Sequence, residues 1–283
     1  MADTRQVRQS RGPVTYALRI FVIVYLFVLV AWPVSEVVKR TFAPIEKGAS
    51  GGVGAFLERL QDPTVTYAFS LTATCAIWAV VINTVFGVGI SLLLVRYRFP
   101  GRRVLSVLVD LPMSVSPVVV GLALVLAYSS GDGWFGGALE SAGIFIIGST
   151  PGLIMATAFV SLPLVIREVV PTLEEIGTDA ELAASSLGAS GWQTFRRITL
   201  PSIKWAVVYG VVLSLARCLG EYGAVSVVSP GAPLRGETAT ILIQKRYTGY
   251  EESVAYAAAF VLVLISVLAL VVVSLIRKPE DPK

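Results

Sequence analysis

The sequence predicts an all-α polytopic membrane protein with about six transmembrane helices. Of its 283 residues, 55% are hydrophobic and only 15% are charged, and the mean hydropathy is +0.75. Soluble domains carry about 25% charged residues, so this chain has too few charges to cover a surface that faces only water. Its long apolar windows must be helical where they meet lipid, because a helix satisfies its own backbone hydrogen bonds.

Six apolar windows are long enough to cross a bilayer. They lie at residues 16–38, within 63–95, at 104–128, within 141–166, at 205–228 and within 253–276. The first follows several arginines, as in a signal peptide, but no small-residue cleavage site follows it, so we expect an uncleaved span. The second window exceeds the roughly 20 residues that a bilayer needs, so its helix should tilt or protrude.

The distribution of lysine and arginine predicts that both termini are cytoplasmic. With the N-terminus inside, fifteen of these residues fall on the inner side and seven on the outer side, leaving aside Arg217. Inner loops of membrane proteins are enriched in positive charge. The segment 129–148, placed outside, has neither lysine nor arginine. A multi-pass protein of a prokaryotic plasma (inner) membrane is therefore expected.

Several function classes are disfavoured by what the sequence lacks. It has no histidine, and its two cysteines lie in apolar stretches, so no metal site, disulfide or catalytic residue is expected. Its arginines flank apolar runs without interleaved aromatics, which disfavours nucleic-acid binding. It also lacks a G-x-x-x-x-G-K-[ST] phosphate loop, so any ATP hydrolysis must occur on another chain.

The cytoplasmic loop after the fourth window carries the strongest local signals. Thr178 and Glu181 have the spacing of a helix capping box, and Gly188 is placed to end that short helix in a left-handed conformation. Ser190 and Gln193 have the spacing of a second box, which predicts a second short helix that closes near Pro201. Two interpretations stay open: a small-residue face that docks into a protein groove, or an amphipathic linker on the membrane surface.

This loop resembles the EAA loop of ABC importer permeases, whose pattern is E-A-A, three residues, G, nine residues, I, one residue and L-P. Leu182 stands where the family has glutamate, and Glu181 lies one residue early, so we expect Glu181 to cap the helix. The resemblance implies a type I ABC importer transmembrane domain whose loop docks onto an ATPase subunit. The expected coupling residues are Glu181, Ala183, Ala184, Leu187, Gly188, Ile198, Leu200 and Pro201.

Two further segments, 111–124 and 215–229, resemble the oxyanion-importing permeases for sulfate and molybdate. The runs 224–229 and 191–203 are similar to CysW-type sulfate/thiosulfate permeases. This resemblance implies an ATP-driven sulfate/thiosulfate importer and no enzyme activity in this chain by itself. A molybdate or tungstate permease is the near alternative, and a self-contained channel or secondary transporter is an alternative of a different class. An intramembrane enzyme would need paired acids in the spans, which the sequence does not offer.

Four residues are candidates for the substrate pathway. Ser114 and Ser116 lie between two prolines that free backbone carbonyls, and irregular backbone within a membrane often lines a cavity. Arg217 and Glu221 are four residues apart and deep in the fifth window. Two interpretations stay open for each pair: helix packing or a pathway for the serines, and a structural ion pair or a transient contact with an anion for Arg217 and Glu221.

The expected organisation has three parts. Residues 1–62 form the cytoplasmic N-terminus, first span and outer loop; residues 63–277 form the permease domain with a coupling loop at 173–203; residues 278–283 form a cytoplasmic tail. The resemblance implies a homologous second permease subunit, two ATPase subunits that bind ATP and Mg, and an extracytoplasmic sulfate-binding protein. Membrane lipid surrounds the whole, and this chain itself needs no cofactor.

Overall fold

A computed structural model describes residues 13–44 and 51–276. The described part of the chain is helical apart from two isolated β-bridges near Ala232, as expected of an all-α membrane protein. The predicted N-terminal cytoplasmic segment before residue 13, part of the first outer loop and the tail 278–283 lie outside the described residues. Within these described ranges, five helices are long and apolar enough to cross a membrane, and counting the bent pair as one span gives up to six.

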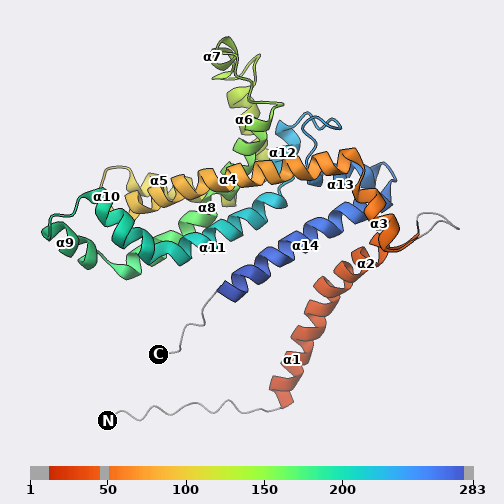
Figure 1. Cartoon of the computed structure of the whole chain (residues 1–283), viewed down its shortest axis with the longest axis horizontal. Coiled ribbons are helices and arrows are strands. Elements are labelled where there is room, and N and C mark those ends of the chain that lie inside the picture. The colour runs from red at the N-terminus through yellow and green to blue at the C-terminus, as the bar shows by residue number, and fades with distance from the viewer. Residues whose placement is uncertain (1–12, 45–50, 277–283) are drawn as a thin grey trace.

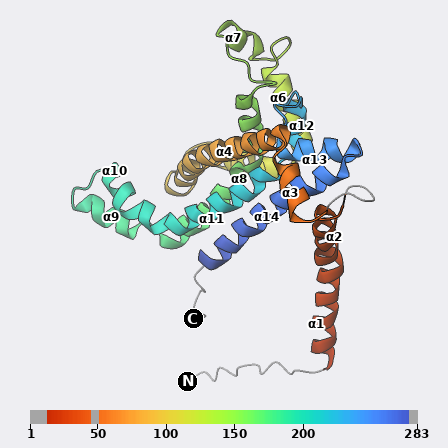
Figure 2. The same cartoon turned by 45° about the vertical axis from the view of Figure 1, so that its right-hand side comes forward.

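The first span stands apart from the rest of the molecule. It is continuous from Val14 to Thr41 and comprises α1 (Pro13–Leu26), a π-helical turn η1 (Phe27–Ala31) and α2 (Trp32–Thr41). None of the most apolar part of this span is buried, and Figures 1 and 2 show α1 extending away from the other helices. Only α2 packs against the body, where it contacts α14 (Glu252–Ile276).

The body is built on α4 (Pro63–Arg96), α8 (Thr150–Ile176) and α11 (Leu200–Leu219), which pack closely together. The 34 residues of α4 correspond to about 51 Å, well beyond the hydrocarbon thickness of about 30 Å, as the second window predicted. Asp62 begins this helix by accepting a hydrogen bond from the backbone of Thr64 (2.7 Å). Short helix α3 (Val53–Leu60) precedes it.

The third window contains a sharp bend, as its irregular backbone between two prolines suggested. It is divided into α5 (Arg102–Ser114) and α6 (Pro117–Tyr128), which meet at an angle of 115°. Val115 and Ser116 are extended, because the ring of Pro117 disfavours a helical residue before it. Pro112, by contrast, lies inside α5 without ending it. Figure 1 shows α6 and the short α7 (Gly136–Ser141) rising away from the long axis of α4.

The fourth and fifth spans also differ from the predicted windows. Helix α8 continues to Ile176, ten residues beyond the window, although Pro163 and Pro171 lie within it. The fifth span begins far earlier than predicted: α10 (Gly191–Thr194), a π-helical turn η2 (Phe195–Thr199) and α11 form one helix of 29 residues. Pro201 is accommodated within it and does not close a separate short helix.

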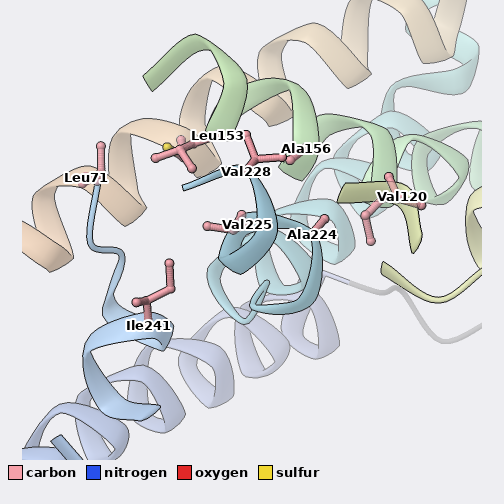
Figure 3. Close-up of a cluster of buried hydrophobic side chains, with 10 residues drawn as sticks. Leu71, Val120, Leu153, Ala156, Ala224, Val225, Val228 and Ile241 are labelled. Atoms are coloured by element: carbon pink, nitrogen blue, oxygen red, sulfur yellow. The ribbon is translucent and has the colours of Figure 1, made fainter. Parts of the chain in front are cut away.

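The fifth span ends at Leu219, before the predicted end of its window. After a break at Gly220 the chain forms α12 (Gly223–Val228), and α13 (Ala239–Thr248) follows. Both α6 and α12 follow breaks in their spans, and they pack on each other. Figure 3 shows Val225 and Val228 of α12 in a cluster with Leu153 of α8 and Ile241 of α13.

Candidate functional site

The loop between the fourth and fifth spans, which the sequence predicted to be cytoplasmic, forms a short helix, α9 (Asp179–Ser186), which Figure 1 shows at one end of the molecule beside α10. Gly188 ends it as predicted, with a φ of +83°. Its N–H donates to the carbonyl of Ser185, and the N–H of Ala189 donates to Ala184, both at 3.0 Å. This pair of bonds is a Schellman motif, which satisfies the last carbonyls of the helix. The second predicted cap is also confirmed, because Ser190 and Gln193 form a reciprocal capping box.

The predicted cap at the start of α9 was wrong. Thr178 occupies the N-cap position but makes no side-chain hydrogen bond there. Glu181 instead turns toward the membrane body: its Oε2 accepts from Nε of Arg96 (2.9 Å) and its Oε1 accepts from Oγ1 of Thr199 (2.8 Å). An ion pair with a half-buried arginine stabilises a carboxylate more than a solvent-exposed cap does. Glu181 therefore links α9 to two spans.

The other expected coupling residues divide between surface and interior. Exposed positions are Ala183, Leu187, Gly188, Leu200 and Pro201, whereas Ala184 and Ile198 are half-buried. Leu187 is 89% exposed, and Leu182 and Trp192, which the sequence analysis did not select, are 62% and 68% exposed. Large apolar side chains exposed beside a polar loop mark an interaction surface. The signal that could have found Trp192 is its position in the first turn of a well-capped helix.

A second site lies where the two broken spans meet. A cavity of about 220 Å³ opens beside the bend between α5 and α6, and it is lined by Pro112, Met113, Val115, Pro117, Val160, Leu164 and Arg217. Arg217 is the charged residue in an otherwise apolar lining. Arg217 lies about 20 Å along the helix from Lys204, near the other end of the span, which places it deep in the membrane. A charge at that depth is costly and is therefore a functional candidate.

Arg217 is paired with Glu221, as the spacing allowed. Nη1 of Arg217 lies 2.7 Å from Oε2 of Glu221. The two residues do not share one helix, because α11 ends at Leu219 and Glu221 lies in the break. Oε1 of Glu221 accepts from the N–H of Ala224 (2.9 Å) and so holds the start of α12.

The environments of the two partners differ in a way that suits an anion contact. The side chain of Glu221 is 2% exposed, whereas that of Arg217 is 38% exposed. Arginine carries five N–H donors in a planar fork, and Glu221 engages one of its nitrogens. Arg217 also lines the cavity. The arrangement provides one half-neutralised positive group, which can contact an oxyanion without holding it tightly.

The serines of the predicted pathway are placed differently. Ser114 is the last residue of α5 and Ser116 precedes α6, and both are exposed. Neither lines the cavity that Arg217 borders. Both remain candidates only for a surface outside this cavity. In the described ranges 13–44 and 51–276, no three histidine, cysteine, aspartate or glutamate residues are grouped to hold a metal ion.

Known proteins resemble this chain along most of its length. It is 44% identical to "Sulfate transport system permease protein CysW" of Synechococcus elongatus, over 96% of this chain and 92% of that protein. It is also 44% identical to the protein of that name from Escherichia coli K12, over 81% of this chain and 78% of that protein. Both comparisons include the broken spans and the cytoplasmic loop.

The fold is shared with membrane subunits of solved ABC transporters. A chain of a bacterial ABC transporter involved in the import of the acidic polysaccharide alginate superposes with a TM-score of 0.75, covering 93% of each chain at 19% identity. Residues 83–279 match the family described as binding-protein-dependent transport system inner membrane component. The chain therefore belongs to the family of binding-protein-dependent transport system inner membrane components.

Proposed function

We propose that this chain is one membrane subunit of an ATP-driven sulfate/thiosulfate importer and forms half of its translocation pathway. The observation that carries the proposal is the similarity to sulfate transport permeases over almost the whole chain, including both sites described above. A half-neutralised arginine beside a membrane cavity supports the passage of a small dianion. The chain is not an ATPase by itself; a partner chain hydrolyses ATP with Mg.

The partners follow from the same family membership. A homologous second permease would supply the other half of the pathway, two ATPase subunits would bind at the cytoplasmic face, and an extracytoplasmic sulfate-binding protein would deliver the substrate. The exposed Leu182, Leu187 and Trp192 of the coupling loop support ATPase docking. The side of the membrane that would hold the coupling loop and both termini carries the excess of lysine and arginine. This excess supports cytoplasmic termini and a prokaryotic inner-membrane location.

An uptake assay with the assembled transporter in proteoliposomes tests the proposal. With the binding protein outside and ATP inside, radiolabelled sulfate should accumulate, and thiosulfate should compete better than molybdate. Strong inhibition by molybdate with weak inhibition by thiosulfate would instead assign a molybdate or tungstate permease. Uptake that continues after the partner ATPase is inactivated would assign a self-contained secondary transporter. Mass measurement of the purified complex should find a second, different permease chain.

A further inference from the structure

The inner end of α4 is bound to the cytoplasmic helix α9 through one arginine. Arg96 is the last residue of α4, and its side chain is only 11% exposed. Its three nitrogens each make a different bond: Nε donates to Glu181 (2.9 Å), Nη1 to the carbonyl of Leu173 (3.0 Å) and Nη2 to the carbonyl of Gly177 (2.7 Å). The whole guanidinium fork is therefore used within the protein.

The three acceptors of Arg96 belong to two helices, α8 and α9. Leu173 and Gly177 are the last turn and the C-cap of α8, and Glu181 is in the first turn of α9. The second oxygen of Glu181 accepts from Thr199, a buried residue in the π-helical turn of the fifth span. Four segments are thus joined by two side chains. We call this set, Arg96, Glu181 and Thr199, the α4–α9 clamp.

An ion pair that only stabilised the fold would not need every donor and acceptor of its two side chains to be engaged. A surface ion pair holds two side chains loosely and contributes little to stability. Here the glutamate is 21% exposed and the arginine 11%, and both carboxylate oxygens and all three guanidinium nitrogens are engaged. Arg96 bonds Glu181 through one nitrogen and two backbone carbonyls through the others, and this set of hydrogen bonds fixes the relative position of the joined segments. The clamp therefore makes α9 and the ends of α4, α8 and the fifth span move together.

We propose that Arg96 is a positioning residue that transmits movement of α9 to α4, in addition to the covalent path through the loop. The inference rests on the proposed docking of α9 onto the ATPase. When the ATPase displaces α9, the clamp would carry that displacement directly to α4, whose other flank packs on α8 along the core. Without the clamp, α9 could follow the ATPase while α4 stayed in place.

Separate measurement of ATP hydrolysis and sulfate uptake in proteoliposomes tests the clamp. In the full complex, Arg96→Gln should lower the sulfate transported per ATP hydrolysed by about tenfold, because charge-assisted hydrogen bonds are lost at a buried site, while hydrolysis itself continues. Arg96→Lys keeps the charge but cannot reach both carbonyls. Its ratio of sulfate transported to ATP hydrolysed should therefore lie between those of the unaltered complex and of Arg96→Gln. Arg98→Gln is the matched control, since Arg98 is exposed and makes no hydrogen bond or ion pair within the described part of the chain.

A distance measurement keeps the proposal testable if Arg96→Gln fails to assemble. Spin labels are placed at Tyr97→Cys and Ser185→Cys, with the native Cys75 and Cys218 replaced. The distance between the two labels should be the same with and without ATP. A change of several ångströms between those states would overturn the clamp, as would an Arg96→Gln complex that transports as much per ATP as the control. Absence of ATP-dependent uptake in the unaltered complex would refute the proposed function instead.

Discussion

The close packing of α4 and α11 on α8 depends on two glycines that face the same valine. A Cβ atom added at Gly210 would lie 2.8 Å from the backbone Cα of Val165, and one added at Gly87 would lie 2.9 Å from Cγ1 of Val165. Carbon atoms pack at about 3.5–4.0 Å, so each methyl group would overlap its neighbour by more than half an ångström. Small residues at such crossings let membrane helices approach without a driving force from water.

We expect Gly210→Ala to destabilise the protein by about 1–2 kcal/mol. Overpacking costs about 1–3 kcal/mol, and the higher helix propensity of alanine returns up to about 1 kcal/mol. Gly87→Ala should destabilise the protein by a similar amount, but its added methyl group would overlap the side chain of Val165 instead of the backbone. A Cβ at Gly89, on the same helix as Gly87, meets nothing within 4 Å, so Gly89→Ala should keep only the propensity gain and raise stability by up to about 1 kcal/mol.

Val165→Ala distinguishes the two contacts. It removes the Cγ1 atom that a Cβ at Gly87 would approach to 2.9 Å but keeps the Cβ of residue 165 at 3.0 Å, so the double variant should be more stable than the sum of the single effects by about 0.5 kcal/mol. The contact of Gly210 is with the Cα of Val165, which alanine retains. The destabilisation of the double variant Gly210→Ala/Val165→Ala should therefore be close to the sum of the two single effects. Both double-mutant cycles are measured as free energies of unfolding in mixed detergent micelles. Equal stability of Gly210→Ala and Gly89→Ala would refute the reasoning.

Three further predictions concern the loop, the cavity and the start of α4. Gly188→Asp should reduce uptake without affecting membrane insertion, because a side chain at φ +83° costs about 1 kcal/mol at the end of α9; Gly188→Asn, which tolerates that conformation, should retain more uptake. Arg217→Gln should lower sulfate uptake about tenfold or more at unchanged assembly, and normal uptake would remove Arg217 from the pathway. Hydrogen bonds from the side chain and backbone of Thr64 lower the pKa of Asp62, so the stability that its charge contributes is present above about pH 4 and is lost as pH falls through the lowered pKa. The difference in melting temperature between wild type and Asp62→Asn should therefore shrink in acid, and a constant difference down to pH 2 would contradict this.

The sequence by itself determined the helical membrane class, the coupling loop and the local caps. Charge-poor windows can be recognised without knowing what they contact, because lipid imposes the same demand on every backbone group. The turn at Gly188 and the box at Ser190 and Gln193 are equally local, since each is made within a few residues of its own helix. Pairing of Arg217 with Glu221 was also accessible, because the two lie four residues apart.

Only the tertiary structure decided which breaks bend the chain and which partner each charge takes. Pro112 and Pro117 look alike in sequence, yet one lies inside a helix and the other begins a new one at 115°, a choice made by packing on α12 and α8. Glu181 has the spacing of a cap but binds Arg96, which lies 85 residues away in the chain. Spacing reports only local options, whereas a buried carboxylate goes to the partner that compensates its lost hydration best, and the fold alone brings that partner within reach.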